Sequence, residues 1–75
     1  MLDAFIVGKV IQERRENKGV SQEVLSGLAD IGRTHLSAIE RGERRPTLDT
    51  FFKISQALEM RASELLHTIE ELHEP

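Results

Sequence analysis

Apolar residues recur at three- and four-residue spacing along most of the chain, which is the period of an amphipathic helix rather than of a strand. Near the start, Asp3 is a suitable N-cap, and Gly19 can adopt the left-handed conformation that ends a helix. The apolar residues between them that share one helical face are Val7, Val10 and Ile11. This segment therefore predicts a first helix over about residues 4–18.

Two short helices joined by a tight corner are predicted next. Ser21 is a good N-cap for the first of them, and residues 30–32 (DIG) leave room only for a turn. The second helix begins at Arg33 and stops at Gly42. The apolar side chains expected to face inward here are Leu25, Leu28, Ala29, Ile31, Leu36 and Ile39.

Two further helices complete the pattern. Thr47 is an N-cap for a fourth helix, and a break at residues 59–61 precedes a last helix over about residues 62–73. The core-spaced residues of the fourth helix are Leu48, Phe51, Ile54 and Leu58, and those of the last are Ala62, Leu65, Leu66, Ile69 and Leu72. The sequence therefore predicts one all-α domain over residues 1–75, with five helices around one core.

Length and composition exclude several kinds of function. A chain of 75 residues has room for one site, and it contains no cysteine and no cluster of histidines and carboxylates with metal-ligand spacing. It lacks a glycine-rich phosphate loop, a membrane-length apolar run and an export signal. We therefore expect a cytoplasmic protein without cofactor, metal or enzymatic activity.

The charge is distributed unevenly along the chain. The formal net charge is −3, which by itself argues against a nucleic-acid partner. Residues 59–75, however, carry five acidic residues and one basic residue, which leaves residues 1–58 slightly basic. Four arginines fall within thirteen residues, namely Arg33, Arg41, Arg44 and Arg45. An acidic end and a locally basic face are thus predicted on the same molecule.

The third predicted helix is the strongest functional signal. A DNA major groove about 12 Å wide admits one α-helix, so a protein that reads it must hold a short helix outward on an apolar support. Counting 100° per residue puts Arg33, Thr34 and Ser37 opposite the apolar residues of this helix, with Ala38 at the rim. Arg33 can bond O6 and N7 of guanine together, although a phosphate contact is its open alternative.

Residues 7–66 resemble the Xre/Cro-like helix-turn-helix repressors. The resemblance is carried by Gly8, Arg15, residues 18–23 (KGVSQE), residues 28–29 (LA) and residues 36–48 (LSAIERGERRPTL). It implies a five-helix, lambda-repressor-like fold with the helix-turn-helix at helices 2 and 3. It also implies sequence-specific binding of double-stranded operator DNA by a homodimer that regulates transcription.

The resemblance also implies roles for individual residues. Those matching base-contact positions are Arg33, Thr34, Ser37 and Ala38. Those expected at the DNA backbone are Ser21, Gln22, His35, Arg41, Arg44 and Arg45. Arg15 and Glu40 occupy positions that pair with each other, and their first role is structural.

The corner and the first helix depart from the family pattern. Asp30 stands where a glycine is usual, and Gly32 stands where a capping Ser or Thr is usual. Arg14 replaces a family leucine, which either trims the core or adds a contact to the DNA backbone. These changes leave the fold in place and affect the local angle of the third helix.

The last helix is the candidate dimerisation element. Leu65 and Leu66 can cover the core of their own subunit, while Ile69 and Leu72 extend past the point that four short helices can cover. The interface residues predicted are Leu65, Ile69 and Leu72. The alternative is that this helix lies over the first helix and buries its whole apolar stripe internally.

A second class of function stays open at this stage. The chain could be a protein-interaction module, such as an antitoxin whose last helix engages a toxin, with DNA binding secondary. The acidic residues 70–75 (EELHEP) are compatible with that alternative. Arg33, Arg44 and Arg45 favour DNA, because a pure protein binder has no evident need for them.

Overall fold

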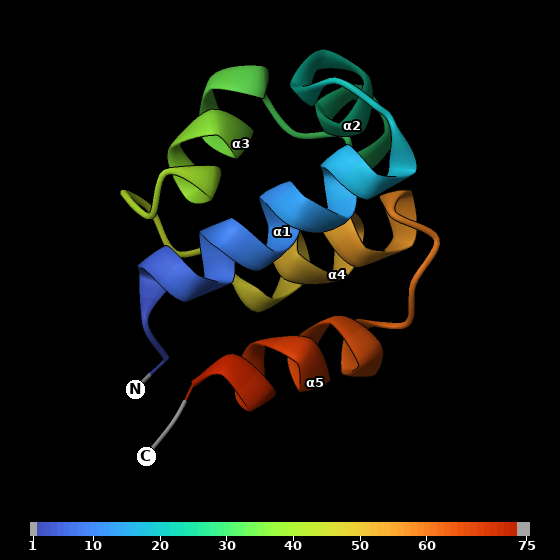
Figure 1. The fold of residues 1–75 in the computed structure, drawn as a ribbon. Coiled ribbons are helices and arrows are strands. Elements are labelled where there is room, and N and C mark those ends of the chain that lie inside the picture. Colours follow the sequence, from blue (N-terminus) through green and yellow to red (C-terminus); the bar gives the residue numbers. More distant parts are fainter. Residues whose placement is uncertain (1, 74–75) are drawn as a thin grey trace.

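The computed structural model describes residues 2–73, and within this range it contains five helices and no strand (Figure 1). The helices are α1 (Ala4–Lys18), α2 (Gln22–Ala29), α3 (Arg33–Glu40), α4 (Leu48–Ala57) and α5 (Ala62–Leu72). The predicted all-α fold of five helices is therefore confirmed. None of these helices is both long enough and apolar enough to cross a membrane.

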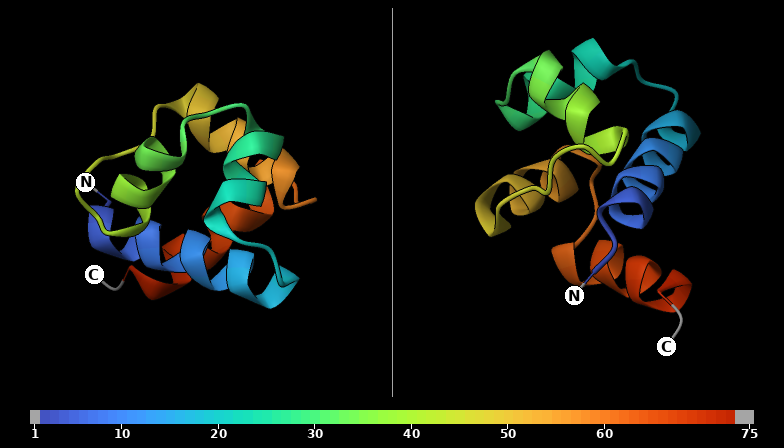
Figure 2. Two further views of the ribbon diagram at one scale, coloured as in Figure 1. Left: turned by 90° about the horizontal axis from the view of Figure 1, so that it is seen from above. Right: turned by 90° about the vertical axis from the view of Figure 1, so that its left-hand side faces the viewer.

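The helices form three levels, with α1 and α4 in the middle. The helix pair α2–α3 packs on one side of them, where α3 contacts α1 and α2 contacts α4. Helix α5 packs against α1 and α4 from the other side, so it lies far from α2 and α3 (Figures 1 and 2). Arg14 takes part in this lower layer, because its guanidinium donates to the Thr68 hydroxyl of α5 at 3.1 Å.

The helix ends are set by short local interactions that the sequence predicts. The side chains of Asp3, Ser21 and Thr47 accept hydrogen bonds from backbone amides in the first turns of α1, α2 and α4. At the other end of α1, Gly19 adopts φ 78°, and its amide donates to the carbonyls of Arg15 and Glu16. These caps satisfy backbone groups that a short helix would otherwise leave unpaired.

The corner between α2 and α3 is built on a left-handed aspartate. Asp30 adopts φ 57° and ψ 47°, a conformation that costs less for Asp than for most residues other than glycine. The amide of Ile31 donates back to the Ser26 carbonyl at 3.0 Å, which closes the turn. Gly32 then caps α3 without a side-chain hydrogen bond. The two helices are thus joined by three residues despite the two departures from the family pattern.

The core confirms most of the predicted inward-facing residues but not all of them. Its members are Val7, Val10, Ile11, Leu25, Ala29, Leu36, Ile39, Ile54, Ala57, Leu58, Leu65 and Ile69. Leu28 and Leu48, predicted to face inward, are instead 61% and 84% exposed. Leu25 and Ala29 fill the side of α2 that meets α4, which leaves Leu28 beside it. Leu48 is the first residue of α4 and lies where no other helix covers it.

Helices α1 and α3 meet through direct backbone contact at Gly8. A Cβ atom built at this position would lie 2.1 Å from the carbonyl oxygen of Ile39 and 2.7 Å from that of Glu40. Real Cβ atoms do not approach backbone this closely, so any larger residue must push α3 away from α1. Gly8 therefore fixes how close α3 lies to the helix that supports it.

Candidate nucleic-acid interface

The polar side of α3 is uncovered in the structure. Arg33 and Thr34 are exposed and Ser37 and Ala38 are half-buried, and we call these four residues the α3 flank. Leu36 and Ile39, on the opposite side of the helix, are 0% exposed. A helix of eight residues is marginal by itself, so this packing is what holds the α3 flank in place.

A buried ion pair joins α1 to the end of α3, as the sequence predicts. Arg15 donates from Nε to Glu40 Oε2 at 2.7 Å and from Nη2 to Glu40 Oε1 at 3.0 Å, a bidentate arrangement. Its Nη1 also donates to the Val20 carbonyl at 3.0 Å. The Glu40 side chain is only 2% exposed. The hydrogen bond from Arg15 to Glu40 raises the pKa of the arginine further, against the opposing effect of burial.

Gln22 connects this ion pair to the α3 flank. It is the first residue of α2, and its Nε2 donates to Glu40 Oε1 at 2.9 Å. Its Oε1 accepts from Arg33 Nη1 at 3.3 Å. The sequence predicted a DNA-backbone contact for Gln22 and did not reveal these two partners. Only the fold brings residues 22, 33 and 40 together, because they lie on two different helices.

Two of the predicted backbone-contact arginines are engaged by the chain itself. Arg41 donates from Nε and Nη2 to the carboxylate of Glu43 at 3.0 and 2.9 Å, and it also bonds the Ser37 hydroxyl. This pairing lowers the pKa of Glu43 and raises that of Arg41, and both residues are exposed. Arg45 donates to the carbonyl of Leu2. These contacts lie at the surface and can be exchanged for others.

The remaining predicted backbone-contact residues surround the α3 flank. Arg44 is exposed in the loop after α3, and His35 is half-buried on α3 itself. Ser21 is exposed and uses its hydroxyl to cap α2, accepting from the Val24 amide at 3.1 Å. The structure therefore brings the predicted DNA-facing residues to one region formed by α3, the start of α2 and the following loop.

The predicted interface on α5 requires correction. Leu65 and Ile69 are 0% and 1% exposed and belong to the core of the subunit. Helix α5 lies flat across α1 and α4, so one side of its apolar stripe is fully covered by its own chain. Leu66 and Leu72, at 38% and 53%, are the residues of α5 that stay exposed.

An apolar groove of about 420 Å³ lies beside the exposed residue Leu66, between α5 and the start of α4. We call it the α4–α5 groove. Its walls are lined by Leu2, Val7, Arg45, Pro46, Thr47, Leu48, Phe51, Ala62, Ser63, Leu66 and Ile69. Sequence reasoning missed this surface because Leu48 fits the core spacing of α4. The position of Leu48 at the first turn of the helix was the one signal that could have indicated exposure.

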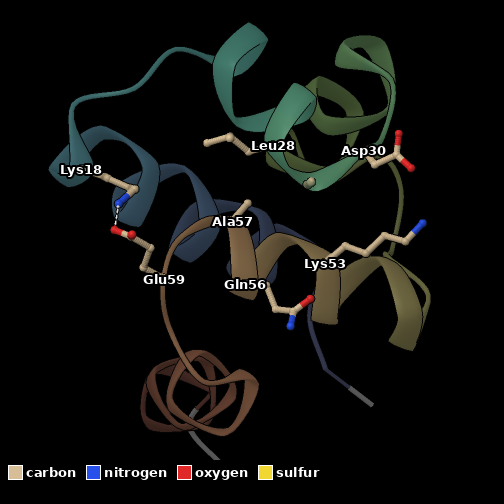
Figure 3. Close-up of a pocket in the computed structure, with 8 residues that line it drawn as sticks. Lys18, Leu28, Asp30, Lys53, Gln56, Ala57 and Glu59 are labelled. Atoms are coloured by element: carbon tan, nitrogen blue, oxygen red, sulfur yellow. Dashed lines mark hydrogen bonds and ion pairs between the residues drawn. The ribbon is translucent and has the colours of Figure 1, made fainter.

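A second hollow of about 480 Å³ lies between α2 and α4 (Figure 3). Lys18 and Glu59 point toward each other there and form an ion pair, while Lys53 and Gln56 extend in different directions. Leu28 forms part of the same wall. Because the charged groups are paired or diverge, this hollow does not present a convergent set of ligands.

A short helix held outward on an apolar support, after a three-residue corner, is the arrangement of helix-turn-helix DNA-binding proteins. The family model described as "Helix-turn-helix" matches residues 11–65. The chain therefore belongs to the helix-turn-helix family of DNA-binding transcriptional regulators.

Relatives with this fold include proteins that control restriction–modification systems. The chain is 45% identical over 58 residues to the control protein C.BamHI of Bacillus amyloliquefaciens, covering 77% of this chain and 72% of that protein. The restriction-modification controller protein C.AhdI from Aeromonas hydrophila superimposes with a TM-score of 0.82 at 35% identity, covering 84% and 96% of the two chains. The controller protein C.Esp1396I, solved as a tetramer with its natural 35-base-pair operator, has a TM-score of 0.84 at 29% identity, with 91% and 90% covered.

Proposed function

We propose that this protein is a transcriptional regulator that binds an operator sequence as a homodimer, with α3 of each subunit in the major groove. The observation that carries the proposal is the uncovered α3 flank, supported from behind by the fully buried side chains of Leu36 and Ile39. It acts by occupying DNA and not by catalysing a reaction. We also infer a cytoplasmic location, because operator DNA lies there in bacteria.

Within this proposal, the α3 flank reads base edges. Arg33 is the main reader, because a guanidinium can donate to O6 and N7 of one guanine. Thr34, Ser37 and Ala38 follow it along the same side of the helix. Ser21, Gln22, His35, Arg41, Arg44 and Arg45 contact the phosphates on either side. Arg41 and Arg45 first exchange their present partners, Glu43 and the Leu2 carbonyl, for phosphate oxygens.

The proposed dimer uses the α4–α5 groove and the exposed residues beside it. Leu48, Leu66 and Leu72 are large apolar side chains on this face, and exposed apolar surface of this kind marks interaction sites. A two-fold dimer would present two α3 helices to half-sites about 34 Å apart. The tetrameric assembly of C.Esp1396I on its operator supports oligomeric binding by a protein of the same fold.

The relatives favour regulation of the controller type. Three of the related proteins are control proteins, from Bacillus amyloliquefaciens, Mycoplasma and Serratia marcescens. We therefore infer that the regulated genes are those of a restriction–modification system, including the gene for this protein. This interpretation favours a DNA-binding regulator over an antitoxin or another protein-interaction module.

The proposal is tested by selecting duplexes from a pool with a randomised central segment and sequencing those that the protein retains. We expect a palindromic consensus to be enriched, and binding to the consensus duplex to weaken steeply as salt rises, with about 0.9 logarithmic units per phosphate neutralised. Arg33→Ala should abolish the preference at one base pair in each half-site. Lys53→Ala, which removes a positive charge on α4, is the control that should retain it. Failure to enrich any sequence would overturn the proposal.

A further inference from the structure

We propose that Gln22 is a positioning residue for Arg33, and that it is itself oriented by the buried carboxylate of Glu40, so that base recognition is coupled to the ion pair in the interior. This inference rests on the proposed function, in which Arg33 reads a base. It assigns to Gln22 a role in specificity in addition to its proposed contact with the DNA backbone.

The first step of the argument is the chemistry of the Gln22 amide. An amide has a donor end and an acceptor end, whereas an ionised carboxylate only accepts and a guanidinium only donates. Gln22 lies between the two, with its Nε2 2.9 Å from Glu40 Oε1 and its Oε1 3.3 Å from Arg33 Nη1. Only one orientation of the amide satisfies both neighbours, so the carboxylate determines that the carbonyl oxygen faces Arg33.

The second step is that Glu40 cannot turn away. Its side chain is 2% exposed, and both of its oxygens accept from Arg15, at 2.7 and 3.0 Å. Arg15 is held in turn by the Val20 carbonyl at 3.0 Å. The Gln22 amide is therefore anchored to a rigid group of α1 and α3 and not to a mobile surface side chain.

The third step concerns Arg33, which is an exposed side chain with many rotamers. Immobilising such a side chain on binding costs conformational entropy, and holding it beforehand reduces that cost. The Gln22 carbonyl supplies one acceptor near the start of α3 and leaves the other guanidinium donors for a base. Because the cost is avoided only when Arg33 makes its contact, losing Gln22 should weaken binding chiefly to duplexes that contain the base read by Arg33.

The experiment uses the full chain and the consensus duplex selected by the wild-type protein, together with duplexes changed at each single base pair. The variants are Gln22→Leu, which removes both hydrogen bonds, and Gln22→Ala, which does so with a better helix former. Gln56→Leu makes the same chemical change on an exposed residue of α4 and is the matched control. Circular dichroism checks that each variant is folded at the temperature of measurement.

We expect both Gln22 variants to lower discrimination about threefold or more at the base pair where Arg33→Ala also loses it, and nowhere else. The double variant Gln22→Leu/Arg33→Ala should discriminate at that position no worse than Arg33→Ala alone. Gln56→Leu should match the wild type.

Two other results would overturn the inference in distinguishable ways. If both Gln22 variants weaken binding equally for all duplexes and keep the wild-type discrimination, then Gln22 is a backbone contact only, and the proposed function stands. If the wild-type protein enriches no duplex, or Arg33→Ala retains full discrimination at every base pair, then Arg33 does not read a base, and the inference fails with the role on which it depends.

Discussion

The two surfaces that the proposed function uses are built in opposite ways. The α3 flank is polar, and its position is fixed entirely by its own subunit through Leu36, Ile39 and the Arg15–Glu40 pair. The α4–α5 groove is apolar, and Leu48 at its edge is 84% exposed. The first surface is complete in one chain, whereas the second leaves apolar area in water until a partner covers it.

This difference determines which kind of damage each surface tolerates. Changes behind the α3 flank act first on the stability of the subunit, because its supports are core residues. Changes in the α4–α5 groove act first on assembly, because its exposed residues contribute little to the folded monomer. The variants below separate these two kinds of effect.

The largest expected effect is that of Gly8→Ala. The new Cβ would lie 2.1 Å from the Ile39 carbonyl oxygen, and backbone cannot move aside as a flexible side chain can. We expect a loss of about 4 kcal/mol in the free energy of unfolding, or failure to fold. Gly27→Ala is the matched control, because a Cβ there meets nothing within 4 Å. It should gain up to about 1 kcal/mol from helix propensity. Equal urea midpoints for the two variants would refute the close approach of α1 and α3.

A smaller loss is expected for Glu40→Ala. The substitution removes the acceptors of Arg15 and Gln22 and leaves a guanidinium, only 11% exposed, without its partner. Breaking a buried ion pair from one side costs about 3 kcal/mol, so the melting temperature should fall well before the base preference changes. Glu13→Ala removes an exposed carboxylate of α1 and should stay within about 0.5 kcal/mol of the wild type. An unchanged melting temperature for Glu40→Ala would show that the pair carries no stability.

These two surfaces also differ in how far the sequence predicted them. Helix ends were well predicted, because the caps at Asp3, Ser21 and Thr47 and the left-handed Gly19 are local devices. The α3 flank was predictable for a similar reason, since eight residues with two buried anchors leave one outward side. The wrong predictions, Leu65 and Ile69 at an interface, concern what covers a helix face. Periodicity tells which side chains share a face, and only tertiary packing decides whether that face meets its own core or a partner.

The contacts of Gln22 and Arg41 mark a second limit of sequence reasoning. Residue types and spacing indicated a role in DNA binding for both, but their partners depend on distances between elements. Glu40 lies 18 residues from Gln22 and becomes its acceptor only because α2 and α3 meet at the corner. Glu43 lies two residues from Arg41, and its regular alternation with arginines was equally compatible with a solvated surface.

The α4–α5 groove can be tested through assembly without unfolding the subunit. Leu66→Glu introduces a charge on the exposed side of α5, where the wild-type residue is 38% exposed. We expect sedimentation to show a monomer at tens of micromolar, and binding of the consensus duplex to weaken about tenfold or more as one half-site is lost. Leu28→Glu makes the same change at a residue that is 61% exposed on α2 and should leave the dimer intact. A dimer that persists in Leu66→Glu would move the interface elsewhere.

The smallest expected effect concerns the loop after α3, where Glu43 competes with DNA for Arg41. Both carboxylate oxygens of Glu43 accept from that guanidinium, so a phosphate must displace them before Arg41 can contact the DNA backbone. Glu43→Gln weakens this competition and removes a negative charge near the duplex, and we expect severalfold tighter binding at low salt with unchanged base preference. The pairing lowers the pKa of Glu43, so the contact is fully present above the usual value of about 4.5 and is lost as pH falls through the lowered pKa. The tighter binding of Glu43→Gln should therefore persist throughout the neutral range. Glu70→Gln, on α5, removes the same charge far from the loop, and an equal gain in that variant would show that only net charge matters.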